Sequence, residues 1–473
     1  MICARAVGLE SEREFGRSIL RRLRGETEER GRLYKEVGAS DLPSYRRLSG
    51  RVLPRILLVM DEFQVLFGED DAIARESGQI LEDLVRRGAA FGIHVLLSSQ
   101  SPSMAGLYGN RIYGQMALRI ALRSEAREAV AILGEGNDAA ARLERPGEAV
   151  YNEEMGHREK NVFIRAALVA PEERTEALAA LRALAQARPH IPPVTFEGRA
   201  VARLAANPDL QARLAQPGWP ARPSALHAWL GEPIEIKPPT AATLERYARS
   251  NLLILGGDEA EAYGLLLSSL VSLAAQIAPA DVRFAVADFA RPESPVHGLF
   301  AGLNLPHPWE VAGPRQTEAL LARLLGLLEQ RLQGEGAATE IFFGIAGLHR
   351  WRALRSADPY LQSEPAKHLA RLAEEGPEVG IHLLVWADGV ATMERVFKRG
   401  GLVNFDLRVA LHLPEKDSND FLTSNAAAKL GENRALFRHE DWEMGRLEKF
   451  KPYALPPADA LDALLTRLRA RGR

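Results

Sequence analysis

Cysteine is almost absent from this chain of 473 residues, in which Cys3 is the only one. A single thiol forms neither an internal disulfide nor a cysteine-based metal cluster, so the sequence fits a reducing cytoplasm. Long apolar runs are also missing, because no stretch is long enough to span a bilayer and Met1 to Arg5 lacks a signal-peptide core. We therefore expect a cytoplasmic protein, whose association with a membrane would depend on a segment or partner outside this chain.

An excess of charge of either sign is missing too, since the net charge is −2. Such a balance gives no global field toward nucleic acid, although it is compatible with a local basic groove. With 46% hydrophobic and 26% charged residues, the composition is that of a soluble globular protein, and the length suits two or three domains. We interpret the basic end, Arg467 to Arg473, as a solvated helix face rather than a nucleic-acid-binding tail.

The first part of the sequence alternates between helical patterns and short apolar runs. One run, residues 56–60, has five apolar residues before Asp61 and Glu62 and predicts a parallel strand that is buried on both faces. The alternation indicates an α/β domain around a mostly parallel sheet. We expect strands at 56–60, 94–99 and 117–122, and helices at 12–35, 76–91 and 125–133.

The amino-acid composition changes between Pro171 and Gly231, where an Ala/Leu/Arg helix precedes a series of prolines. After this segment the alternation of helical patterns and apolar runs resumes. The proline positions are 189, 192, 193, 208, 217, 220 and 223. We expect a linker with short helices at 171–231, between a first domain at 1–170 and a second domain at 232–473. The second domain has predicted strands at 251–257, 282–287, 341–345 and 381–386, and predicted helices at 259–277 and 364–375.

The two halves share sequence segments in the same order and at similar separations. Residues 92–97 (GIHVLL) reappear as 380–385 (GIHLLV), and residues 118–123 (LRIALR) reappear as 407–412 (LRVALH). Residues 137–143 (NDAAARL) partly match residues 425–430 (NAAAKL). These matches indicate an internal duplication of one domain.

The pair Asp61-Glu62 is the feature with the clearest chemistry. A strand that ends in two acids is the second signature of P-loop ATPases: the first acid holds magnesium, usually through water, and the second orients or deprotonates the attacking water. Both acids belong at the C-terminal end of a strand, where ligand crevices open in parallel sheets. Taken alone, the same pattern also fits a strand that stops at a charged turn.

The surrounding residues resemble the FtsK/SpoIIIE-type motor ATPases, a family that includes the EccC ATPases of type VII secretion. The resemblance covers most of the chain and rests on the segments 57–63 (LLVMDEF), 84–94 (LVRRGAAFGIH), 96–102 (LLSSQSP) and 119–123 (RIALR), preceded by the helix containing 28–30 (EER) and 33–34 (LY) and by Tyr45. It implies tandem RecA-like P-loop NTPase domains that use ATP and Mg²⁺, with a first copy that is incomplete at its N-terminus.

This resemblance also implies roles for individual residues. Asp61 and Glu62 are the catalytic acids, with Asp61 on magnesium through water, and Gln100 takes the position of a sensor that contacts the γ-phosphate or its water. Arg119 and Arg123 are either arginine fingers toward a neighbouring subunit or structural ion-pair partners. His94 and His382, at equivalent positions of the two copies, are interpreted as core histidines.

The family pattern breaks at its phosphate-binding loop, because the chain contains no G-x-x-x-x-G-K-[ST] motif. In the first copy we expect this loop before residue 1 or on a separate chain. In the second copy its place is taken by 256–264 (GGDEAEAYG), which has three acids and no lysine. Ala346 and Gly347 stand where the first copy has Asp61 and Glu62, so the second copy is predicted to be a pseudo-ATPase domain.

Three functions are compatible with these residues. The leading hypothesis is an ATP-driven ring that moves duplex DNA, gripped at its phosphates. The second is an EccC-like secretion ATPase whose cargo is a secreted protein. The third is a non-catalytic scaffold, because a chain without a phosphate-binding loop is not expected to hydrolyse ATP alone. In the first two cases we expect a homo-oligomeric ring.

Overall fold

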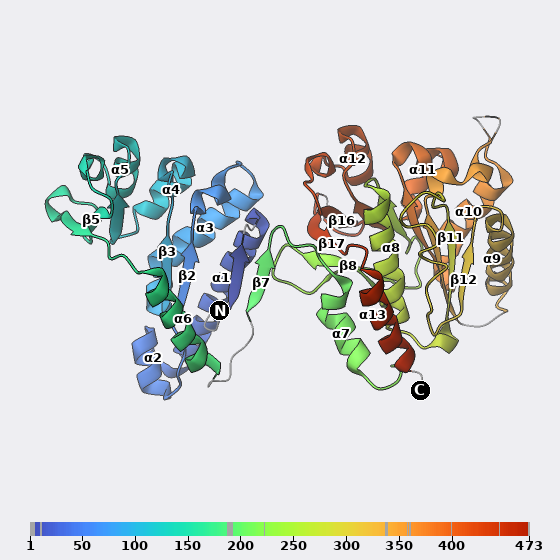
Figure 1. Cartoon of the computed structure of the whole chain (residues 1–473), viewed down its shortest axis with the longest axis horizontal. Helices are drawn as coiled ribbons and strands as arrows, with labels where there is room; N and C mark the ends of the chain where they lie inside the picture. Colours follow the sequence, from blue (N-terminus) through green and yellow to red (C-terminus); the bar gives the residue numbers. More distant parts are fainter. Residues whose placement is uncertain are drawn as a thin grey trace. The chain divides into compact units, whose positions relative to one another are not determined.

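A computed structural model describes residues 5–9, 12–186, 193–221, 223–335, 339–356, 358, 361–398, 400–443 and 445–471. The chain divides into two compact units, Met1–Arg199 and Ala200–Arg473 (Figure 1). The division falls inside the segment 171–231, in which a linker is expected. Some residues named above lie outside the described residues: Cys3 near the N-terminus, the linker residues Pro189 and Pro192, and the last two residues of the basic C-terminal end.

The second unit is built around one large sheet. The sheet has ten strands in the order β12-β11-β13-β14-β10-β15-β16-β17-β8-β9. The first six strands of this order run parallel, and the remaining four pair antiparallel. Their bounds are β8 Leu226–Pro233, β9 Thr240–Leu244, β10 Leu252–Leu255, β11 Val282–Asp288, β12 Trp309–Ala312, β13 Glu340–Ala346, β14 Ile381–Ala387, β15 Leu407–Ala410, β16 Ala435–His439 and β17 Glu448–Pro452.

Helices cover both faces of this sheet, so the parallel strands are buried on both sides, as continuous apolar runs require. One apolar core contains side chains of α8 (Glu259–Ala274) and α13 (Ala458–Ala470). The core on the other face contains side chains of α9 (Thr317–Leu332), α10 (Glu364–Glu375), α11 (Val390–Phe397) and α12 (Glu415–Leu422). The α/β architecture expected from the sequence is confirmed.

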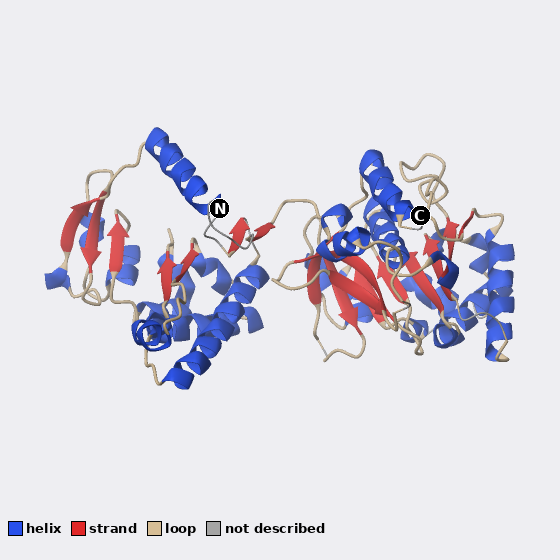
Figure 2. Cartoon of the chain, turned by 90° about the horizontal axis from the view of Figure 1, so that it is seen from below, coloured by secondary structure: helices blue, strands red, loops and turns tan. Residues whose placement is uncertain are grey.

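The first unit has smaller, separate sheets. Strands β2 (Ile56–Met60) and β3 (Ile93–Leu97) form a parallel pair, and β4 (Arg119–Leu122), β5 (Glu148–Asn152) and β6 (Val162–Arg165) form an antiparallel sheet. A short parallel pair joins β1 (Ala6–Leu9) to β7 (Val194–Glu197). Figure 2 shows the strands of this unit in distinct groups, whereas those of the second unit form one continuous sheet.

Helices cover one face of the β2–β3 pair. The core on this face contains side chains of α1 (Arg13–Val37), α3 (Ala72–Arg87) and α4 (Gly106–Tyr113) together with Leu58 and Ile93. The other helices are α2 (Leu42–Ser49), α5 (Ala126–Leu133) and α6 (Pro171–Gln186) in the first unit and α7 (Pro208–Ala215) in the second. Among the described residues no helix is long and apolar enough to cross a membrane.

The strand register supports the internal duplication. Leu57 of β2 lies opposite His94 of β3, and Phe342 of β13 lies opposite His382 of β14. Because the two histidines occupy matching positions in the repeated sequence, β2 corresponds to β13 and β3 to β14, residue by residue. By the same register Asp61 and Glu62 correspond to Ala346 and Gly347.

Two expectations for the first unit are wrong. Strand β2 is not buried on both faces, because Leu57 and Val59 are 61% and 59% exposed, and His94 is exposed on the same face while its counterpart His382 is 2% exposed. The physical reason is that, within the described part of the chain, no helix covers this face. The second wrong expectation is that His94 is a core histidine, because its ring lies on this exposed face. Strand β4 belongs to a separate antiparallel sheet.

Candidate functional site

The acid pair of the first unit stands at the end of a strand and meets the residues that follow the neighbouring strand. Asp61 and Glu62 come directly after β2, and Ser98 to Gln100 come directly after β3. Because β2 and β3 are parallel neighbours, their C-terminal ends share one edge of the sheet. The hydroxyl of Ser98 donates a hydrogen bond of 2.5 Å to Oδ1 of Asp61, which fixes the orientation of that carboxylate.

Glu62 has a backbone conformation that is rare for a residue with a side chain. Its φ and ψ are 49° and 45°, in the left-handed region. Its carboxylate accepts hydrogen bonds from the side-chain amide of Gln64 and from the backbone N–H of Gln100, the latter at 3.3 Å. A strained backbone that aims a carboxylate at a strand edge is typical of functional positions.

The counterpart of Glu62 in the second unit keeps this conformation without the acid. Gly347 has φ 94° and ψ 53°, also left-handed, at the end of β13. A glycine adopts these angles with little cost, whereas Glu62 does not. The local chain path is thus common to both copies, and only the first copy retains a carboxylate on it.

Gln100 lies beside the acid pair, as its proposed sensor position requires. The contact that the structure gives is between its backbone N–H and Glu62, and its side chain is exposed. A contact between the amide side chain and a γ-phosphate remains a prediction.

Arg119 begins β4, and its guanidinium is bound to the main chain. It donates hydrogen bonds of 2.9 to 3.2 Å to carbonyl oxygens 3, 6 and 13 residues away, those of Met116, Tyr113 and Ile132. Burial lowers the pKa of Arg119 from its usual value. This geometry favours the structural alternative for Arg119 over a finger toward another subunit.

Arg408 of the second unit repeats the pattern of Arg119. It donates to carbonyl oxygens that are again 3, 6 and 13 residues away, those of Phe405, Leu402 and Phe421. Because a copy without catalytic acids keeps all three bonds, they serve the fold. Arg123 is exposed, and the described residues include no hydrogen-bond or ion-pair partner for it, so its guanidinium is available to an outside group.

The side chains at this edge fit the ligands that Mg²⁺ prefers. Magnesium in nucleotide sites is held by one or two carboxylates, with phosphate and water oxygens completing its shell. Asp61 supplies an exposed carboxylate, and the hydroxyl of Ser98 lies against it. The described residues contain no cluster of three or more His, Cys, Asp or Glu side chains that could hold a metal ion.

The second unit contains the strand and helix that flank a phosphate-binding loop, with altered residues between them. β10 ends at Leu255, and Gly256 follows with φ 79°. A Cβ atom at Gly256 would lie 2.5 Å from the carbonyl oxygen of His412, so a glycine is required there. Counting the motif from Gly256 places Glu261, Ala262 and Tyr263 where glycine, lysine and serine or threonine are needed.

Side chains fill the space next to this altered loop. The indole N–H of Trp386, which corresponds to Ser98, donates a hydrogen bond of 3.1 Å to the carbonyl of Gly256. Arg350 lies over the Trp386 ring at 5.6 Å and forms an ion pair with Glu259. Burial alone would raise the pKa of Glu259, but hydrogen bonds from Ser294 and Arg350 hold it below its usual value. Arg350, the cation beside this loop, is thus engaged by Glu259.

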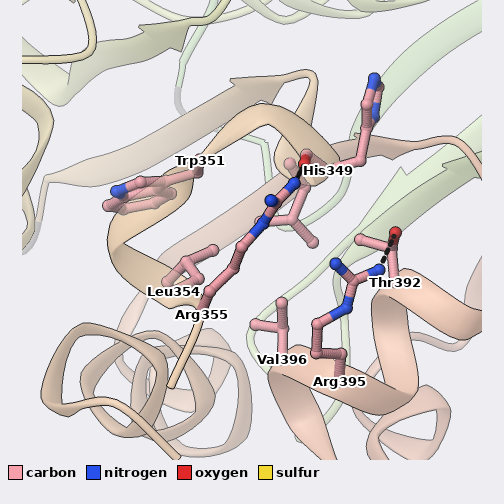
Figure 3. A pocket seen from close by; sticks show the side chains of 8 residues that line it. His349, Trp351, Leu354, Arg355, Thr392, Arg395 and Val396 are labelled. Carbon is pink, nitrogen blue, oxygen red and sulfur yellow. Dashed lines mark hydrogen bonds between the residues drawn. The ribbon is translucent and has the colours of Figure 1, made fainter. Parts of the chain in front are cut away.

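A small pocket opens just beyond the end of β13 (Figure 3). Leu354 and Val396 form its apolar part, and two guanidinium groups stand at its edge. Arg355 donates to the carbonyl of His349, and Arg395 donates to the hydroxyl of Thr392. None of the residues that line it corresponds to Asp61 or Glu62.

Sequence reasoning missed two residues of these sites. Ser98 was part of the quoted segment 96–102, but only the parallel pairing of β2 and β3 shows that it contacts Asp61. Trp386 fills the corresponding position of the second unit. The alignment of the two copies pairs these residues and was the signal that could have identified both.

Known proteins resemble this chain in sequence and in structure. No protein-family model matches the chain. The ESX secretion system protein YukB of Bacillus subtilis (strain 168) is 27% identical over 138 residues, which cover 28% of this chain and 9% of YukB. The ESX secretion system protein EccC of Geobacillus thermodenitrificans (strain NG80-2) is 26% identical over 147 residues, which cover 30% of this chain and 9% of that protein. The matched region is thus a small part of both relatives.

Solved structures match nearly the whole chain. The cytoplasmic domain of the Thermomonospora curvata type VII secretion ATPase EccC matches with a TM-score of 0.64 and 19% identity, over 96% of this chain and 55% of that one. ATPases 2 and 3 of the same EccC, solved with a signal sequence peptide, match with a TM-score of 0.54 and 18% identity, over 93% and 76%. ATPases 2 and 3 of EssC from Geobacillus thermodenitrificans match with a TM-score of 0.54 and 15% identity, over 95% and 80%.

At such identities the structural likeness establishes the fold, which is that of tandem P-loop ATPase domains. The sequence matches to the two ESX proteins establish the relationship. The homologues of this chain are therefore the type VII secretion ATPases of the EccC and EssC type, and its resemblance to the FtsK/SpoIIIE-type P-loop ATPases is confirmed.

Proposed function

We propose that this chain is part of an ATP-driven protein secretion motor, in which the first unit supplies the acidic half of an ATPase site and the second unit binds no nucleotide. The observation that carries the proposal is the pair Asp61 and Glu62, held against Ser98 and Gln100 at one strand edge. The second unit keeps the same chain path but has Ala346 and Gly347 in place of the acids.

The residues of the first unit have distinct roles in this proposal. Asp61 would hold magnesium, which screens the charge of the phosphates when it is bound with ATP. Glu62 would orient the attacking water, and the Gln100 amide would sense the γ-phosphate. Arg123, whose guanidinium is unengaged within the described residues, is the better candidate for a finger toward a neighbouring nucleotide in a ring.

The proposed cargo is a secreted protein that carries a signal sequence, in place of the duplex DNA expected first. The two curated relatives are ESX secretion system proteins, and one structural relative was solved with a signal sequence peptide. A net charge of −2 gives no general attraction to DNA. A ring of copies in the cytoplasm is the arrangement that we propose for this activity.

ATP hydrolysis by the chain together with a G-x-x-x-x-G-K-[ST] segment tests the catalytic assignment. Glu62→Gln and Asp61→Ala should each lower turnover by about 100-fold or more, the usual contribution of a positioned base or metal ligand. The matched control is Glu135→Gln, which removes an exposed carboxylate outside the site and should leave turnover unchanged. Turnover that survives Glu62→Gln would contradict the role of this residue.

Stimulation of the same ATPase distinguishes the two cargoes. A signal sequence peptide from a secreted substrate should raise turnover, whereas duplex DNA at low salt should not. The opposite result would restore the DNA motor and remove the secretion proposal.

A further inference from the structure

The pocket beyond the end of β13 combines an apolar floor with a cationic edge (Figure 3). Leu354 and Val396 are each 3% exposed and form the floor, whereas Arg355 and Arg395 are exposed at the edge. Each guanidinium donates a hydrogen bond to a neutral oxygen, and within the described residues neither has a carboxylate partner. The pocket thus offers unengaged donors to an anionic group, next to an apolar surface.

The first unit has a surface at the equivalent position. Residues 348–396 include every residue that lines the pocket, and their counterparts, 63–108, all lie in the described part of the first unit. The counterparts follow from the matched strands β2 and β13, and β3 and β14, when residues are counted onward from each strand without a gap. The matched pairs are Leu354 and Glu69, Arg355 and Asp70, Thr392 and Met104, and Arg395 and Leu107.

This surface of the first unit is acidic and carries protruding apolar side chains. Met104 and Leu107 are 71% and 79% exposed. The side chains of Glu69 and Asp70 are 77% and 89% exposed. We call these four residues the α4 patch. Exposed apolar side chains that are grouped in this way mark a place where another surface packs.

Local contacts hold the α4 patch together without engaging its acids strongly. The rings of Phe67 and Tyr108 stack with their centroids 4.9 Å apart, which keeps the acidic segment beside α4. Arg13 and Arg75 lie 3.5 and 3.6 Å from the two carboxylates of the patch. Ion pairs of such exposed acids contribute little to stability, so the carboxylates can exchange these partners for others.

The pocket and the α4 patch are complementary in shape and in charge. The patch has protruding apolar side chains beside two carboxylates, and the pocket has a recessed apolar floor beside two guanidinium groups. A guanidinium can hold a carboxylate through two parallel hydrogen bonds. Equivalent positions of the two units thus carry opposite charges, which favours contact between unlike units over contact between like ones.

We propose that the α4 patch on the first unit of one copy of this chain docks into the pocket on the second unit of another copy. Leu107 would fill the apolar part of the pocket, and the two acids of the patch would face Arg355 and Arg395. Because the two surfaces differ, the contact is heterologous, and repeated copies close into a ring or extend as a filament. The inference deepens the ring of the proposed function by naming its surfaces, and its tests measure association rather than ATP turnover.

Charge reversal in the full chain tests the contact. One variant combines Glu69→Arg with Asp70→Arg, and the other combines Arg355→Glu with Arg395→Glu. In sedimentation at about 100 μM, a range in which small interfaces associate, each variant alone should associate about tenfold more weakly than the unmodified chain or worse. An equimolar mixture of the two should regain association, because each patch then meets a pocket of opposite charge.

The regained association excludes misfolding as the cause of the loss. The matched control combines Glu374→Arg with Glu378→Arg, at exposed acids that precede β14 and thus lie at the other end of this strand from the pocket. It should associate like the unmodified chain. The inference is overturned if the unmodified chain is monomeric at this concentration, or if the mixture stays as weak as its components.

A disulfide between chains tests the position of the contact. In a Cys3→Ser background, which has no other cysteine, a chain with Leu107→Cys and a chain with Val396→Cys should form a linked dimer when they are mixed and oxidised. Leu48→Cys, at a leucine of α2 that is 59% exposed, replaces Leu107→Cys in the control and should give no such dimer. If one chain that carries both substitutions forms only an internal disulfide, the contact lies within a chain and the inference fails.

Two further outcomes separate the inference from its alternatives and from the proposed function. If the unmodified chain is monomeric and a signal sequence peptide binds it until Arg355→Glu and Arg395→Glu abolish binding, the occupant is that peptide and the inference fails. ATP turnover by the chain with its G-x-x-x-x-G-K-[ST] segment, without association, would leave the proposed function standing and overturn the inference. Association through these surfaces without turnover would confirm the contact and overturn the proposed function.

Discussion

The left-handed backbone at Glu62 gives a stability test that is separate from catalysis. Glu62→Gly and Glu62→Ala remove the same carboxylate and its contacts with Gln64 and Gln100. The two variants therefore differ mainly in the free-energy cost of the left-handed backbone conformation. Because alanine is strained at positive φ, we expect Glu62→Gly to leave the first unit about 1 kcal/mol more stable than Glu62→Ala does. Urea unfolding of both variants measures this difference.

Gly347 provides the matched control for Glu62 in the other copy. A Cβ atom added there would lie 3.5 Å or more from its neighbours, so space is available and only the backbone resists. Gly347→Ala should therefore destabilise the second unit by about 1 kcal/mol. Equal stabilities of the Gly and Ala variants at both positions would show that the strain is not real.

Arg119 and Arg123 differ in their connections, and their substitutions should differ in cost. Arg119→Ala removes three hydrogen bonds to carbonyl oxygens and should lower the free energy of unfolding by about 2 to 4 kcal/mol. Arg123→Ala should change it by less than about 0.5 kcal/mol. Urea unfolding of the two variants tests the structural role assigned to Arg119. A small effect of Arg119→Ala on the free energy of unfolding would contradict that role and favour a functional one.

At the scale of single residues, the sequence predicted positions better than contacts. Asp61 and Glu62 were placed at the C-terminal end of a strand because ligand crevices open there in parallel sheets, and Gln100 was placed beside them by the family resemblance. The bond from Ser98 to Asp61 and the main-chain bonds of Arg119 depend on loop conformations, which carry no periodic signal. A guanidinium group can serve either as an arginine finger toward a neighbouring nucleotide or as a structural hydrogen-bond donor to the main chain. The residue type alone therefore did not separate these two roles.

The N-terminus of α8 gives a prediction that depends on pH. The folded state lowers the pKa of Glu259, so its ion pair with Arg350 stabilises the second unit above the unfolded-state pKa of about 4.3 and loses this contribution as pH falls through the folded-state value. Glu259→Gln should cost about 1 kcal/mol at pH 7 and nothing at about pH 2 to 3. Thermal unfolding over this range measures it.

The control for this pH dependence is Glu378→Gln, at an exposed carboxylate outside the α8 region. Its effect on stability should be close to zero and should not change with pH. A cost of Glu259→Gln that stays constant down to pH 3 would contradict the ion-pair assignment.

At the scale of elements, local patterns located fewer than half of the helices and strands and did not determine what covers them. The predicted helix at 12–35 corresponds to α1, and the predicted strand at 56–60 to β2. Burial of β2 on both faces was wrong because it depends on a distant element that would pack on the open side. In the second unit, side chains of α8 share a core with Phe342 of β13, the counterpart of the exposed Leu57.

The whole chain has separate apolar cores in its two units, which predicts two unfolding transitions. Leu84→Ala, in the core under β2, should shift one transition, and Phe343→Ala, in a core of the second unit, should shift the other. Each should cost about 3 to 5 kcal/mol in its own unit. Differential scanning calorimetry resolves the two, and a common shift would show that the units unfold together.

The retained chain path at Gly347 has a consequence for the history of the second unit. In the genetic code, glycine and glutamate codons can differ by a single base, and so can alanine and aspartate codons, so the acid pair could return to the end of β13 by two small mutational steps. The loop beyond β10 is harder to restore, because Tyr263 is buried and Glu259 is paired with Arg350. The loop beyond β10, rather than the end of β13, is therefore the part of the second unit that would be harder to convert to the P-loop pattern.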